Sequence, residues 1–506
     1  MRLGIDFGTT RTVVAAVLDG RHPLAAFDTG GEFTEHVPGL AALCGGRLRV
    51  GWDAARAIAS GEAEHAIRSI KRVAAALAPD DPVPGLPGTT ALELCTAFLA
   101  EVRRNLVESS NLDVHGPLEA MLAVPASTPS RQRWLTLEAA RRAGFTPLGL
   151  LNEPTAASIE YAHRYLGALG KRSPKRYVVI YDLGGGTFDA SAVSLEDRRF
   201  DLIASDGVAR LGGDDFDELI LAAACETAGT SPPPAARAAA LERVREAKES
   251  LRPTSRRFLV ELEGAPVTLD VGAIYARCQP LIDETLVHTE RLFERLRLRG
   301  IDPDDVRELG GVYLVGGAAA FPAVARSLRA RFGRKLQLAP QPFAATAAGL
   351  AIAADPDADV RVREAVTRHF GVWREGEGGA DKVFDRLIDK DTAADGPLVV
   401  RRRYRPTHSV GHLRFLECGT LDEAGQPIDD LVPAADVYFP YDPSLADRAE
   451  LARAPVEHRP DLLAEEISET YTYAPDGTIE ICIENLTHGY ARRFALGAPR
   501  APLLRG

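Results

Sequence analysis

One stretch decides how this sequence folds: Tyr177-Val178-Val179-Ile180-Tyr181-Asp182-Leu183-Gly184-Gly185-Gly186-Thr187-Phe188-Asp189. Its first five residues are apolar and predict a strand that ends at Asp182, and the small residues Gly184–Thr187 predict a tight turn. Phe188–Leu195 then continues as a second strand, and Phe200–Ser205 makes a third after a polar turn. The pattern is a strand, an acid, a glycine-threonine loop and a returning strand.

The same pattern occurs at the N-terminus. Its parts are the strand Arg2–Asp6, the turn Phe7–Thr10, the β-branched strand Thr12–Leu18, the hairpin turn Asp19-Gly20 and a third strand, Pro23–Phe27. Asp6 and Asp182 hold the same place in the two copies, which are separated by about the length of one domain. This spacing predicts an internal duplication.

The two loops indicate a chemistry. Glycine and threonine present backbone N–H groups and hydroxyls, and only residues without bulky side chains let a phosphate oxygen approach closely. Two such hairpins can hold one polyphosphate from both sides, while Asp6 and Asp182 offer the oxygen ligands that Mg²⁺ prefers, and Asp189 adds a third acid. The pattern therefore favours phosphoryl transfer.

A third glycine element supports a nucleotide site. The apolar strand at Leu314-Val315 leads into Gly316-Gly317, ahead of a predicted helix at Pro322–Phe332, and glycine backbone near a helix start suits a nucleotide. The chain has neither the glycine fingerprint of dinucleotide folds nor a Walker A loop, so both of those classes are excluded.

Composition and net charge exclude further classes of protein. The chain has 506 residues, of which 45% are hydrophobic and 26% charged, as is typical of soluble globular proteins. Its length is sufficient for several hydrophobic cores. Its net charge of −11 argues against nucleic acid, and the basic run Arg401–Arg405 is interpreted as an edge strand protected by charge. No apolar stretch is long enough for a membrane span. The six cysteines form no CxxC pair and suggest buried thiols in a reducing cytoplasm.

Further elements complete the expected organisation. Predicted helices are Leu92–Glu108, Ser130–Ala143, Asn152–Leu166, Asp214–Ala228, Ala239–Leu251 and Phe343–Ala354. After an acidic, proline-containing linker at Asp355–Asp359, short alternating runs predict a small all-β domain from Glu364 onward. An irregular insertion is expected around Pro433–Pro460.

Five strings occur in a fixed order: IDFGTT (Ile5–Thr10), NEPTAA (Asn152–Ala157), DLGGGTFD (Asp182–Asp189), LGGDDFD (Leu211–Asp217) and VGG (Val315–Gly317). Over roughly Met1–Ala354 this set resembles the nucleotide-binding domain of the 70-kilodalton heat-shock chaperones, the DnaK-type members of the actin-like ATPase fold. The resemblance implies a duplicated α/β, ribonuclease H-like fold with lobes at about 1–170 and 171–354, a linker at 355–363 and a β-sandwich-like domain at 364–506. It also implies an ATPase with ATP/ADP and Mg²⁺ as cofactors.

The resemblance assigns roles to individual residues. Lys71 stands where the family keeps the lysine that positions the attacking water, and Glu153 matches the acid that links the magnesium water shell to the two halves. The implied catalytic set is Lys71, Glu153, Asp182, Thr187 and Asp189, with Asp6 and Asp182 holding Mg²⁺ through water. The implied nucleotide-binding set is Gly8, Thr9, Thr10, Gly184, Gly185, Gly186, Thr187, Gly212, Gly213, Glu246, Lys248, Gly316 and Gly317. Pro125 and Arg133 resemble the relay that reports nucleotide state to the substrate domain.

The chain departs from the family pattern beside the base. The family's Gly-Gly-Ser-x-Arg is replaced by Gly316–Ala320, which lacks both side chains, and Arg245 stands where an acid is expected. We therefore expect phosphate and metal contacts to remain while base contacts are fewer, at about 0.5–1.5 kcal/mol for each lost hydrogen bond. The C-terminal third resembles the family only faintly, with a half-charged linker at Val360–Arg363 and no helical lid expected.

Two functions follow from the resemblance. The first is a molecular chaperone that couples Mg-ATP hydrolysis to binding and release of polypeptide clients, with J-domain and nucleotide-exchange cochaperones as possible partners. The second is a nucleotide-dependent interaction module for one dedicated partner, suggested by the charged linker, the expected lack of a lid and the insertion. A filament-forming protein or a sugar kinase on the same fold fits less well, because of the string Asp182–Asp189 and the β-rich tail. No membrane or nucleic-acid partner is expected.

Overall fold

The computed structural model describes residues 1–165, 174–196, 199–208, 210–376, 381–392 and 396–498. Contacts divide the chain into two units, Met1–Ala126 with Glu138–Val362, and Ser127–Leu137 with Arg363–Gly506. No helix in the described residues has both the length and the apolar character needed to cross a bilayer.

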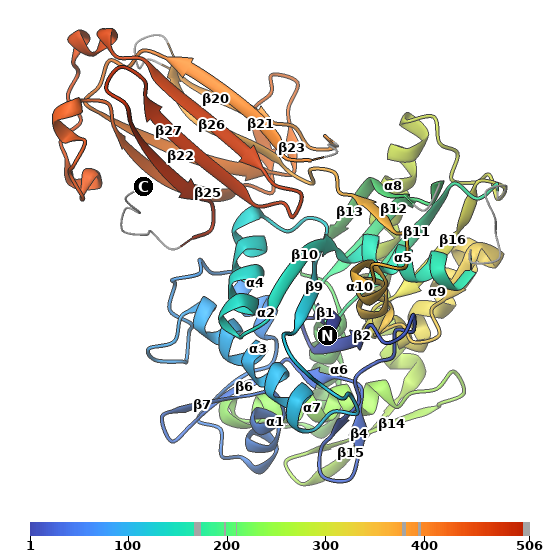
Figure 1. The fold of residues 1–506 in the computed structure, drawn as a ribbon. Coiled ribbons are helices and arrows are strands. Elements are labelled where there is room, and N and C mark those ends of the chain that lie inside the picture. Colours follow the sequence, from blue (N-terminus) through green and yellow to red (C-terminus); the bar gives the residue numbers. More distant parts are fainter. Residues whose placement is uncertain (166–173, 197–198, 209, 377–380, 393–395, 499–506) are drawn as a thin grey trace. The chain divides into compact units, whose positions relative to one another are not determined.

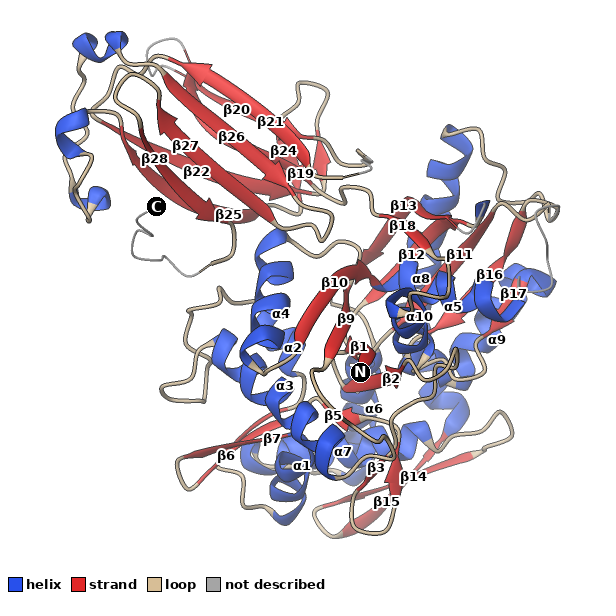
Figure 2. Ribbon diagram, viewed as in Figure 1, coloured by secondary structure: helices blue, strands red, loops and turns tan. Residues whose placement is uncertain are grey.

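The first unit contains two sheets built on one plan (Figures 1 and 2). The first sheet has the order β10-β9-β1-β2-β5. Its strands are β1 (Arg2–Phe7), β2 (Arg11–Ala16), β5 (Val37–Pro38), β9 (Glu119–Val124) and β10 (Thr146–Asn152). β1 is antiparallel to β2 and parallel to β9, and β9 is parallel to β10.

The second sheet repeats this plan with the order β17-β16-β11-β12-β13-β18. Its strands are β11 (Tyr177–Leu183), β12 (Phe188–Ser194), β13 (Arg199–Val208), β16 (Leu309–Val315), β17 (Leu336–Leu338) and β18 (Arg361–Arg363). β11 is antiparallel to β12 and parallel to β16, and β16 is parallel to β17. The matching order and directions confirm the predicted duplication of one α/β lobe.

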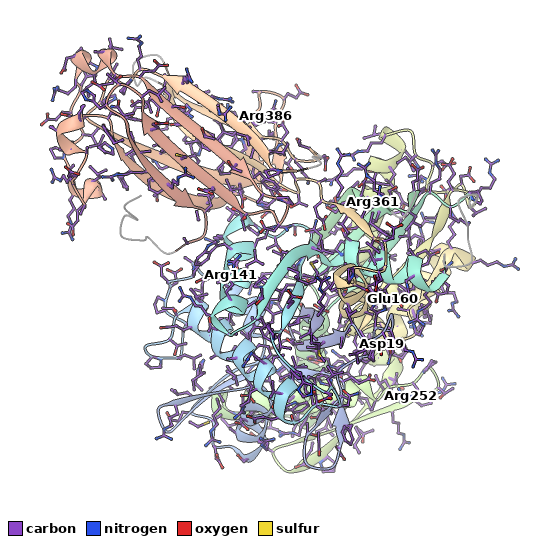
Figure 3. All side chains as sticks on the ribbon, in the orientation of Figure 1. Asp19, Arg141, Glu160, Arg252, Arg361 and Arg386 are labelled. Atoms are coloured by element: carbon purple, nitrogen blue, oxygen red, sulfur yellow. The ribbon has the colours of Figure 1, made fainter. Side chains whose placement is uncertain are left out.

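Two helices with small residues pack between the sheets. α5 (Glu153–Tyr165) and α10 (Ala345–Ala354) contact each other, and α10 also covers β1 (Figure 1). A Cβ on Gly349 of α10 would lie only 1.8 Å from the Ala156 carbonyl oxygen of α5, so only glycine permits this approach. On α5, the buried Glu160 (labelled in Figure 3) accepts a 2.7 Å hydrogen bond from the Tyr313 hydroxyl of β16.

The remaining elements of this unit surround the two sheets. The helices are α1 (Gly51–Ser60), α2 (Ile70–Ala75), α3 (Ala91–Glu108), α4 (Ser130–Arg142), which continues into the second unit, α6 (Gly213–Ala228), α7 (Pro234–Glu249), α8 (Val271–Leu298) and α9 (Pro322–Phe332). The short strands are β3 (Phe27–Asp28), β4 (Phe33–Thr34), β6 (Ala41–Cys44), β7 (Arg47–Val50), β8 (His65–Ile67), β14 (Arg257–Leu262) and β15 (Ala265–Asp270). The sequence analysis missed α8 and the β14–β15 hairpin.

The second unit contains a sandwich of two antiparallel sheets, ordered β20-β19-β22-β25 and β21-β26-β27-β28. The strands are β19 (His369–Gly376), β20 (Asp381–Ile388), β21 (Leu398–Tyr404), β22 (Val410–Cys418), β25 (Val432–Pro440), β26 (Ile467–Tyr473), β27 (Ile479–Asn485) and β28 (Tyr490–Ala495), with a small hairpin of β23 (Thr420–Leu421) and β24 (Pro427–Asp429). Phe370 stacks on Phe415 in the core, and Tyr471 from the other sheet meets both edge-on. The predicted all-β C-terminal region is therefore confirmed.

Two predicted segments differ from the structure. Pro433–Pro440 was expected to belong to an irregular insertion, but it forms most of β25, which pairs along β22. The prediction failed because prolines are tolerated at the edge of a sheet, where β25 lies. Pro23–Phe27 is not a full third strand. Leu24 makes one bridge to Ala15, and β5 pairs with β2 instead.

The predicted boundary between the lobes, at 170/171, lies outside the described residues. The boundaries given for the linker, 355–363, stay a prediction. Within that range Arg361–Arg363 forms β18 beside β13, while Val360 and Val362 pack against the apolar core of the second sheet. Alternation of valine and arginine therefore lets this charged segment act as an edge strand.

Candidate functional site

The two glycine-threonine loops face each other in the first unit. The first joins β1 to β2 and the second joins β11 to β12. A Cβ added to Gly185 would lie 2.4 Å from Cγ2 of Thr10, and one added to Gly186 would lie 2.7 Å from Cγ2 of Thr9. Any side chain at these glycines would push the loops apart. The duplicated loops therefore lie against each other at one place in the unit.

Three aspartates lie beneath the loops. Asp182 and Asp189 are directly paired across β11 and β12, and both are largely buried. Burial, and then the charge of Glu153, raise the pKa of Asp6 to about 7, although Lys71 opposes this. The pKa of Asp182 is raised well above its usual range by burial, then by Glu153 and Asp6. The charge of Asp6 is thus one of the causes that raise the pKa of Asp182, and Glu153 acts on both groups, so the three carboxyls lie within electrostatic reach of one another.

A lysine faces this group of acids. Lys71 lies in the first turn of α2 and Glu153 is the first residue of α5. The Lys71 Nζ donates a 2.7 Å hydrogen bond to Glu153 Oε1, and both side chains are mostly buried. Burial and then Glu153 also raise the pKa of Asp189 well above its usual range. One lysine cannot compensate four ionised carboxylates, which is why the pKa values of Asp6, Asp182 and Asp189 stay raised.

Glycine-rich backbone closes the other side of the site. Gly316 has a φ of 90°, and a Cβ there would lie 2.5 Å from Asp182 Oδ1, so both its conformation and its contact require glycine. The Gly213 N–H donates to the Gly184 carbonyl oxygen at 3.0 Å, and Lys248 Nζ donates to the Gly213 oxygen at 2.8 Å. This network ties the start of α6 to the second loop.

A small pocket opens beside the loops. It is lined by Thr10, Arg11, Gly185, Gly213, Asp214, Asp217, Arg245, Lys248, Glu249, Gly317, Ala318, Ala320 and Phe321. Asp214 Oδ1 is buried there and accepts no hydrogen bond from the described residues. A Cβ on Gly317 would meet nothing within 4 Å. The pocket therefore has an open floor and an acceptor suited to a ligand hydroxyl or amino group.

Ion pairs join the two lobes around this pocket. Arg11 of β2 pairs with Glu249 of α7. Arg68 lies 3.1 Å from Asp217 and 2.7 Å from Glu242, measured between nitrogen and oxygen atoms. In addition, Arg72 Nη2 lies 3.1 Å from Asp215 Oδ1. The lobes are therefore held together by charges on both sides of the site.

The donor set can be tested for a metal. In the described part of the chain, no three His, Cys, Asp or Glu side chains are arranged to hold a metal ion directly. Mg²⁺ commonly keeps several waters and uses one or two carboxylates together with phosphate oxygens. The carboxyl oxygens of Asp6 and Asp182 fit such an ion, held through water beside a phosphate, because a bound cation would favour the ionised forms that burial opposes.

Comparison with known proteins agrees with this geometry. The family model described as "Hsp70 protein" matches residues 89–367, more than half of the chain. The chain belongs to the Hsp70 family. Membership implies the actin-like ATPase fold, in agreement with the two duplicated sheets.

Curated relatives of this Hsp70-family chain carry the name "Chaperone protein HscA homolog". The protein from Chromobacterium violaceum is 34% identical over 377 residues, which cover 70% of this chain and 58% of the relative. The one from Paracidovorax citrulli is 32% identical over 419 residues, covering 77% and 64%, and the one from Bordetella pertussis is 34% identical over 378 residues, covering 70% and 58%. The chain spans about three fifths of the length of these relatives.

Most of the residues predicted for an Hsp70-type site lie together. The structure brings together Asp6, Lys71, Glu153, Asp182 and Asp189, the loops Gly8–Thr10 and Gly184–Thr187, and the backbone at Gly212, Gly213, Gly316 and Gly317 with Lys248. Glu246 is exposed and is not among the residues that line the pocket. Pro125 follows β9 in the first unit, whereas Arg133 belongs to the second, where its Nη1 donates to the Asp476 oxygen at 3.4 Å.

Sequence reasoning missed four charged residues that line the pocket of this Hsp70-family member, namely Arg11, Asp214, Asp217 and Glu249. Two of them could have been predicted from the sequence, because Asp214 and Asp217 are part of the string LGGDDFD and lie three residues apart on one face of a helix. Arg11 directly follows the first loop, but nothing near it in sequence points to its partner Glu249.

Proposed function

We propose that this chain is an Mg²⁺-dependent ATPase whose nucleotide state controls the binding of a polypeptide. The observation that carries the proposal is the direct contact of the two glycine-threonine loops above the Asp6–Asp182 acid group. Family membership supports ATP as the ligand.

The backbone N–H groups and hydroxyls of the loops would hold the phosphates. In this proposal Thr9, Thr10 and Gly184–Gly186 contact the β- and γ-phosphates, with Thr187 beside the γ-phosphate. Lys71, oriented by its hydrogen bond to Glu153, positions the attacking water and stabilises charge on the γ-phosphate. Asp189, which pairs with Asp182 across the neighbouring strands, is the proposed acceptor of the proton of that water in its ionised form.

Asp6 and Asp182 are the residues that would hold Mg²⁺, through water. When bound, the ion neutralises the charge of the phosphates and orients them. The positive charge of Lys71, which is paired with Glu153, then offsets part of the remaining negative charge of the site.

The nucleoside would occupy the pocket beyond the loops. Its floor at Gly317 is open, and Ala318 and Ala320 offer no side-chain donors to a base. Asp214 Oδ1, buried without a hydrogen-bond partner among the described residues, would accept from a ribose hydroxyl. Fewer base contacts predict weaker discrimination between ATP and other nucleoside triphosphates.

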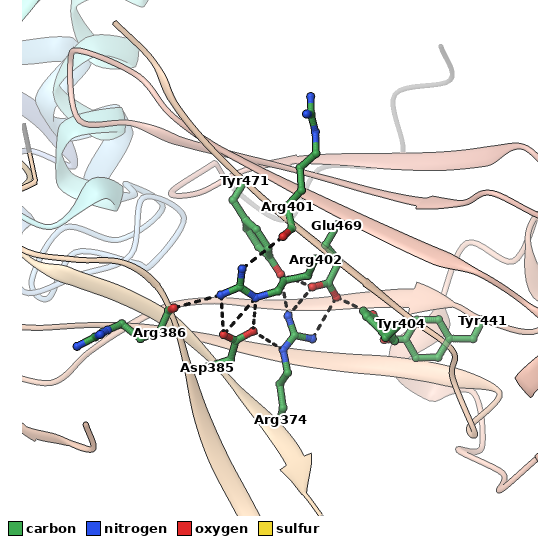
Figure 4. A network of polar contacts seen from close by, with 9 residues as sticks. All are labelled: Arg374, Asp385, Arg386, Arg401, Arg402, Tyr404, Tyr441, Glu469 and Tyr471. Carbon is green, nitrogen blue, oxygen red and sulfur yellow. Dashed lines mark hydrogen bonds and ion pairs between the residues drawn. The ribbon is translucent and has the colours of Figure 1, made fainter. Parts of the chain in front are cut away.

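The β-sandwich of the second unit is the proposed polypeptide-binding part, with clients and with J-domain or nucleotide-exchange cochaperones as its partners. The alternative function, an interaction module for one dedicated partner, is favoured by one observation. The outward face of β21, at the corner of the sandwich beside β20, carries the exposed Arg401 and Arg403 above a network of paired charges that includes the buried Glu469 (Figure 4). A charged surface discriminates between partners more strongly than an apolar one.

Six free cysteines occur in the described residues, and four of them are buried. They favour a reducing compartment, so we propose a cytoplasmic location.

The deciding experiment measures ATP hydrolysis and polypeptide binding together. Purified chain with Mg²⁺ should hydrolyse ATP slowly, lose this activity in EDTA, and bind polypeptides with different affinity in ATP and ADP. Binding to an array of unrelated unfolded peptides would support a general chaperone. One stoichiometric partner recovered from a lysate, with no binding to that array, would support the dedicated module. Neither hydrolysis nor nucleotide binding would refute the proposal.

A further inference from the structure

One strand of the β-sandwich has an open edge. β21 is the outermost strand of its sheet and pairs with β26 through all seven of its residues, from Leu398–Tyr473 to Tyr404–Ile467. No other strand of the described residues pairs with its second side. The backbone N–H and C=O groups on that side are set out in strand geometry, which is what an extended peptide needs in order to add as a further strand.

The outward face of β21 is mostly basic. Val399, Arg401 and Arg403 alternate along it and are all exposed, while the residues between them turn inward. Arg403 has only a 3.6 Å ion pair with Glu466, with 65% of its side chain exposed. Among the described residues, Arg401 has no carboxylate within ion-pair distance, and its guanidinium points away from the buried network in Figure 4. Both guanidinium groups are therefore available to an incoming ligand.

The inward face of the same strand is held rigidly. Arg402 donates to Asp385 of β20, with Nη2 3.0 Å from Oδ1, and Arg374 donates to the same carboxylate, with Nε 2.8 Å from Oδ2 (Figure 4). Arg374 also pairs with Glu469, which is fully buried and accepts from the Tyr404 hydroxyl at 2.6 Å. Since these contacts join the edges of the two sheets, β21 is presented as a preformed template, which lowers the entropy lost on binding.

The same arginines that protect this edge against an apolar or basic strand determine which strand can add to it. Four arginines occur within Arg401–Arg405 in a chain whose net charge is −11. On an added strand, the residues opposite Arg401 and Arg403 share one face, and acidic side chains there would form two cross-strand ion pairs, with an aliphatic residue opposite Val399. A nucleic acid is a poorer fit, because the nearest aromatic rings are engaged. Tyr404 is hydrogen-bonded to Tyr441, and Trp373 packs on Phe384.

We propose that β21 binds an extended acidic polypeptide segment by strand addition, with acidic residues at two alternate positions and an aliphatic residue at the next alternate position. The proposal deepens the proposed function and rests on it in one respect, namely that the β unit is the part of the chain that holds a polypeptide. The inference adds the chemical class of the bound polypeptide, which is an extended acidic segment.

The test uses the full chain with ADP and a fluorescent peptide of about ten residues that carries this pattern. Binding is measured by anisotropy against a peptide in which Asp and Glu are replaced by Asn and Gln. The amide peptide and the variant R401E/R403E should each bind at least about tenfold more weakly, because the ion pairs are lost or become repulsive. The matched control is R493E, on the edge strand β28 at the other side of the same sheet, which should bind like the original chain.

Two further arms test the binding mode. N-methylation of alternate peptide bonds removes the hydrogen-bond donors that face β21 and should abolish binding, whereas methylation of the other set should not. Circular dichroism checks that R401E/R403E is folded, and R401Q/R403Q, which removes the charges without repulsion, should weaken binding by a smaller factor.

The outcomes separate this inference from the function on which it rests. Equal affinity for the acidic and amide peptides, insensitivity to both sets of N-methylation, or displacement by single-stranded DNA at the same site would overturn strand addition by an acidic segment. Binding of an uncharged apolar peptide that ignores R401E/R403E would overturn it and leave the proposed function standing. If no peptide of any class binds while ATP is hydrolysed, the polypeptide-binding function fails as well.

Discussion

Lys71 Nζ lies 2.7 Å from Glu153 Oε1, although the two residues come from the start of α2 and the start of α5 and are far apart in the sequence. Around this pair lie Asp6, Asp182 and Asp189, each with a raised pKa. Lys71 is therefore a cation at the centre of this acid group, and we expect its removal to slow the chemical step more than it weakens nucleotide binding.

We expect K71A to lower the turnover of ATP by at least about a hundredfold, because a positioned charge beside the transferring phosphoryl group contributes mainly to the transition state. The affinity for ADP should change little. Single-turnover hydrolysis and ADP titration separate the two effects. K382A, at an exposed lysine of β20, is the control. A K71A protein that hydrolyses ATP at the original rate would exclude Lys71 from the reaction.

Two glycines of the site should respond differently to alanine. In G185A the new methyl group meets the Thr10 side chain at about 2.4 Å, so the loops must separate, and the unfolding free energy should fall by about 1–3 kcal/mol together with nucleotide affinity. In G317A the methyl group enters open pocket space, so stability should be unchanged while nucleotide affinity falls. Urea denaturation and nucleotide titration of both variants check this. A stable G185A protein with full affinity would contradict the contact between the loops.

Some of this site is readable from the sequence and some is not. The loops and their acids are local patterns, so Asp6 and Asp182 could be matched by inspection. They lie on different sheets, and the close approach of the two loops brings them to one site. The partners Arg11 and Glu249 come from different lobes, and no local pattern joins them. Likewise, Glu469 shares the inward face of its strand with Ile467 and Tyr471. A buried charge is costly there, and only the structure shows that Arg374 of the other sheet compensates the charge of Glu469. Proline-bounded β25 was missed because its prolines lie where an edge strand tolerates them.

The Arg11–Glu249 pair should slow the release of nucleotide. It joins the two lobes beside the pocket and is partly exposed, so it contributes no more than about 1 kcal/mol, or up to about fivefold in rate. We expect E249Q to release a fluorescent ADP analogue about two- to fivefold faster at low salt, with the difference lost at high salt. Stopped-flow mixing measures this. E308Q, at an exposed ion pair with Arg176 away from the pocket, is the control. Release that is salt-independent in both proteins would refute the role.

Acid should destabilise the first unit through His36. Burial, and then the charges of Arg11 and Arg245, lower the pKa of this histidine to about 3, and its ring packs against Trp52. Because the folded pKa is below the unfolded value of about 6.5, the stabilisation is present above pH 6.5 and is lost as pH falls towards 3. In that pH range His36 should contribute up to about 1.4 kcal/mol per pH unit to the slope of the unfolding free energy against pH.

Urea denaturation between neutral and mildly acidic pH checks the contribution of His36. The slope of unfolding free energy against pH should be smaller in H36Q than in the original chain. H115Q, at an exposed histidine, should leave the slope unchanged. Identical slopes in all three proteins would show that His36 is protonated in the folded state as easily as in the unfolded one.

Glu469 should be essential to the fold of the β-sandwich. Its carboxylate is fully buried and is held by Arg374 and by the hydroxyls of Tyr404 and Tyr471. E469Q keeps the shape but leaves the arginine without its main counter-charge, which typically costs about 3–5 kcal/mol in a buried pair. Replacing both partners in R374M/E469M should recover most of this loss, since the desolvation of two charges disappears with them.

Amide exchange in β26 during urea titration reports on the stability of the sandwich locally. The control E480Q, at an exposed ion pair of the neighbouring strand β27, should change that stability by less than about 1 kcal/mol. If the double variant is no more stable than E469Q, apolar packing cannot replace the pair, and the network must be holding the strands in a geometry that only its hydrogen bonds provide.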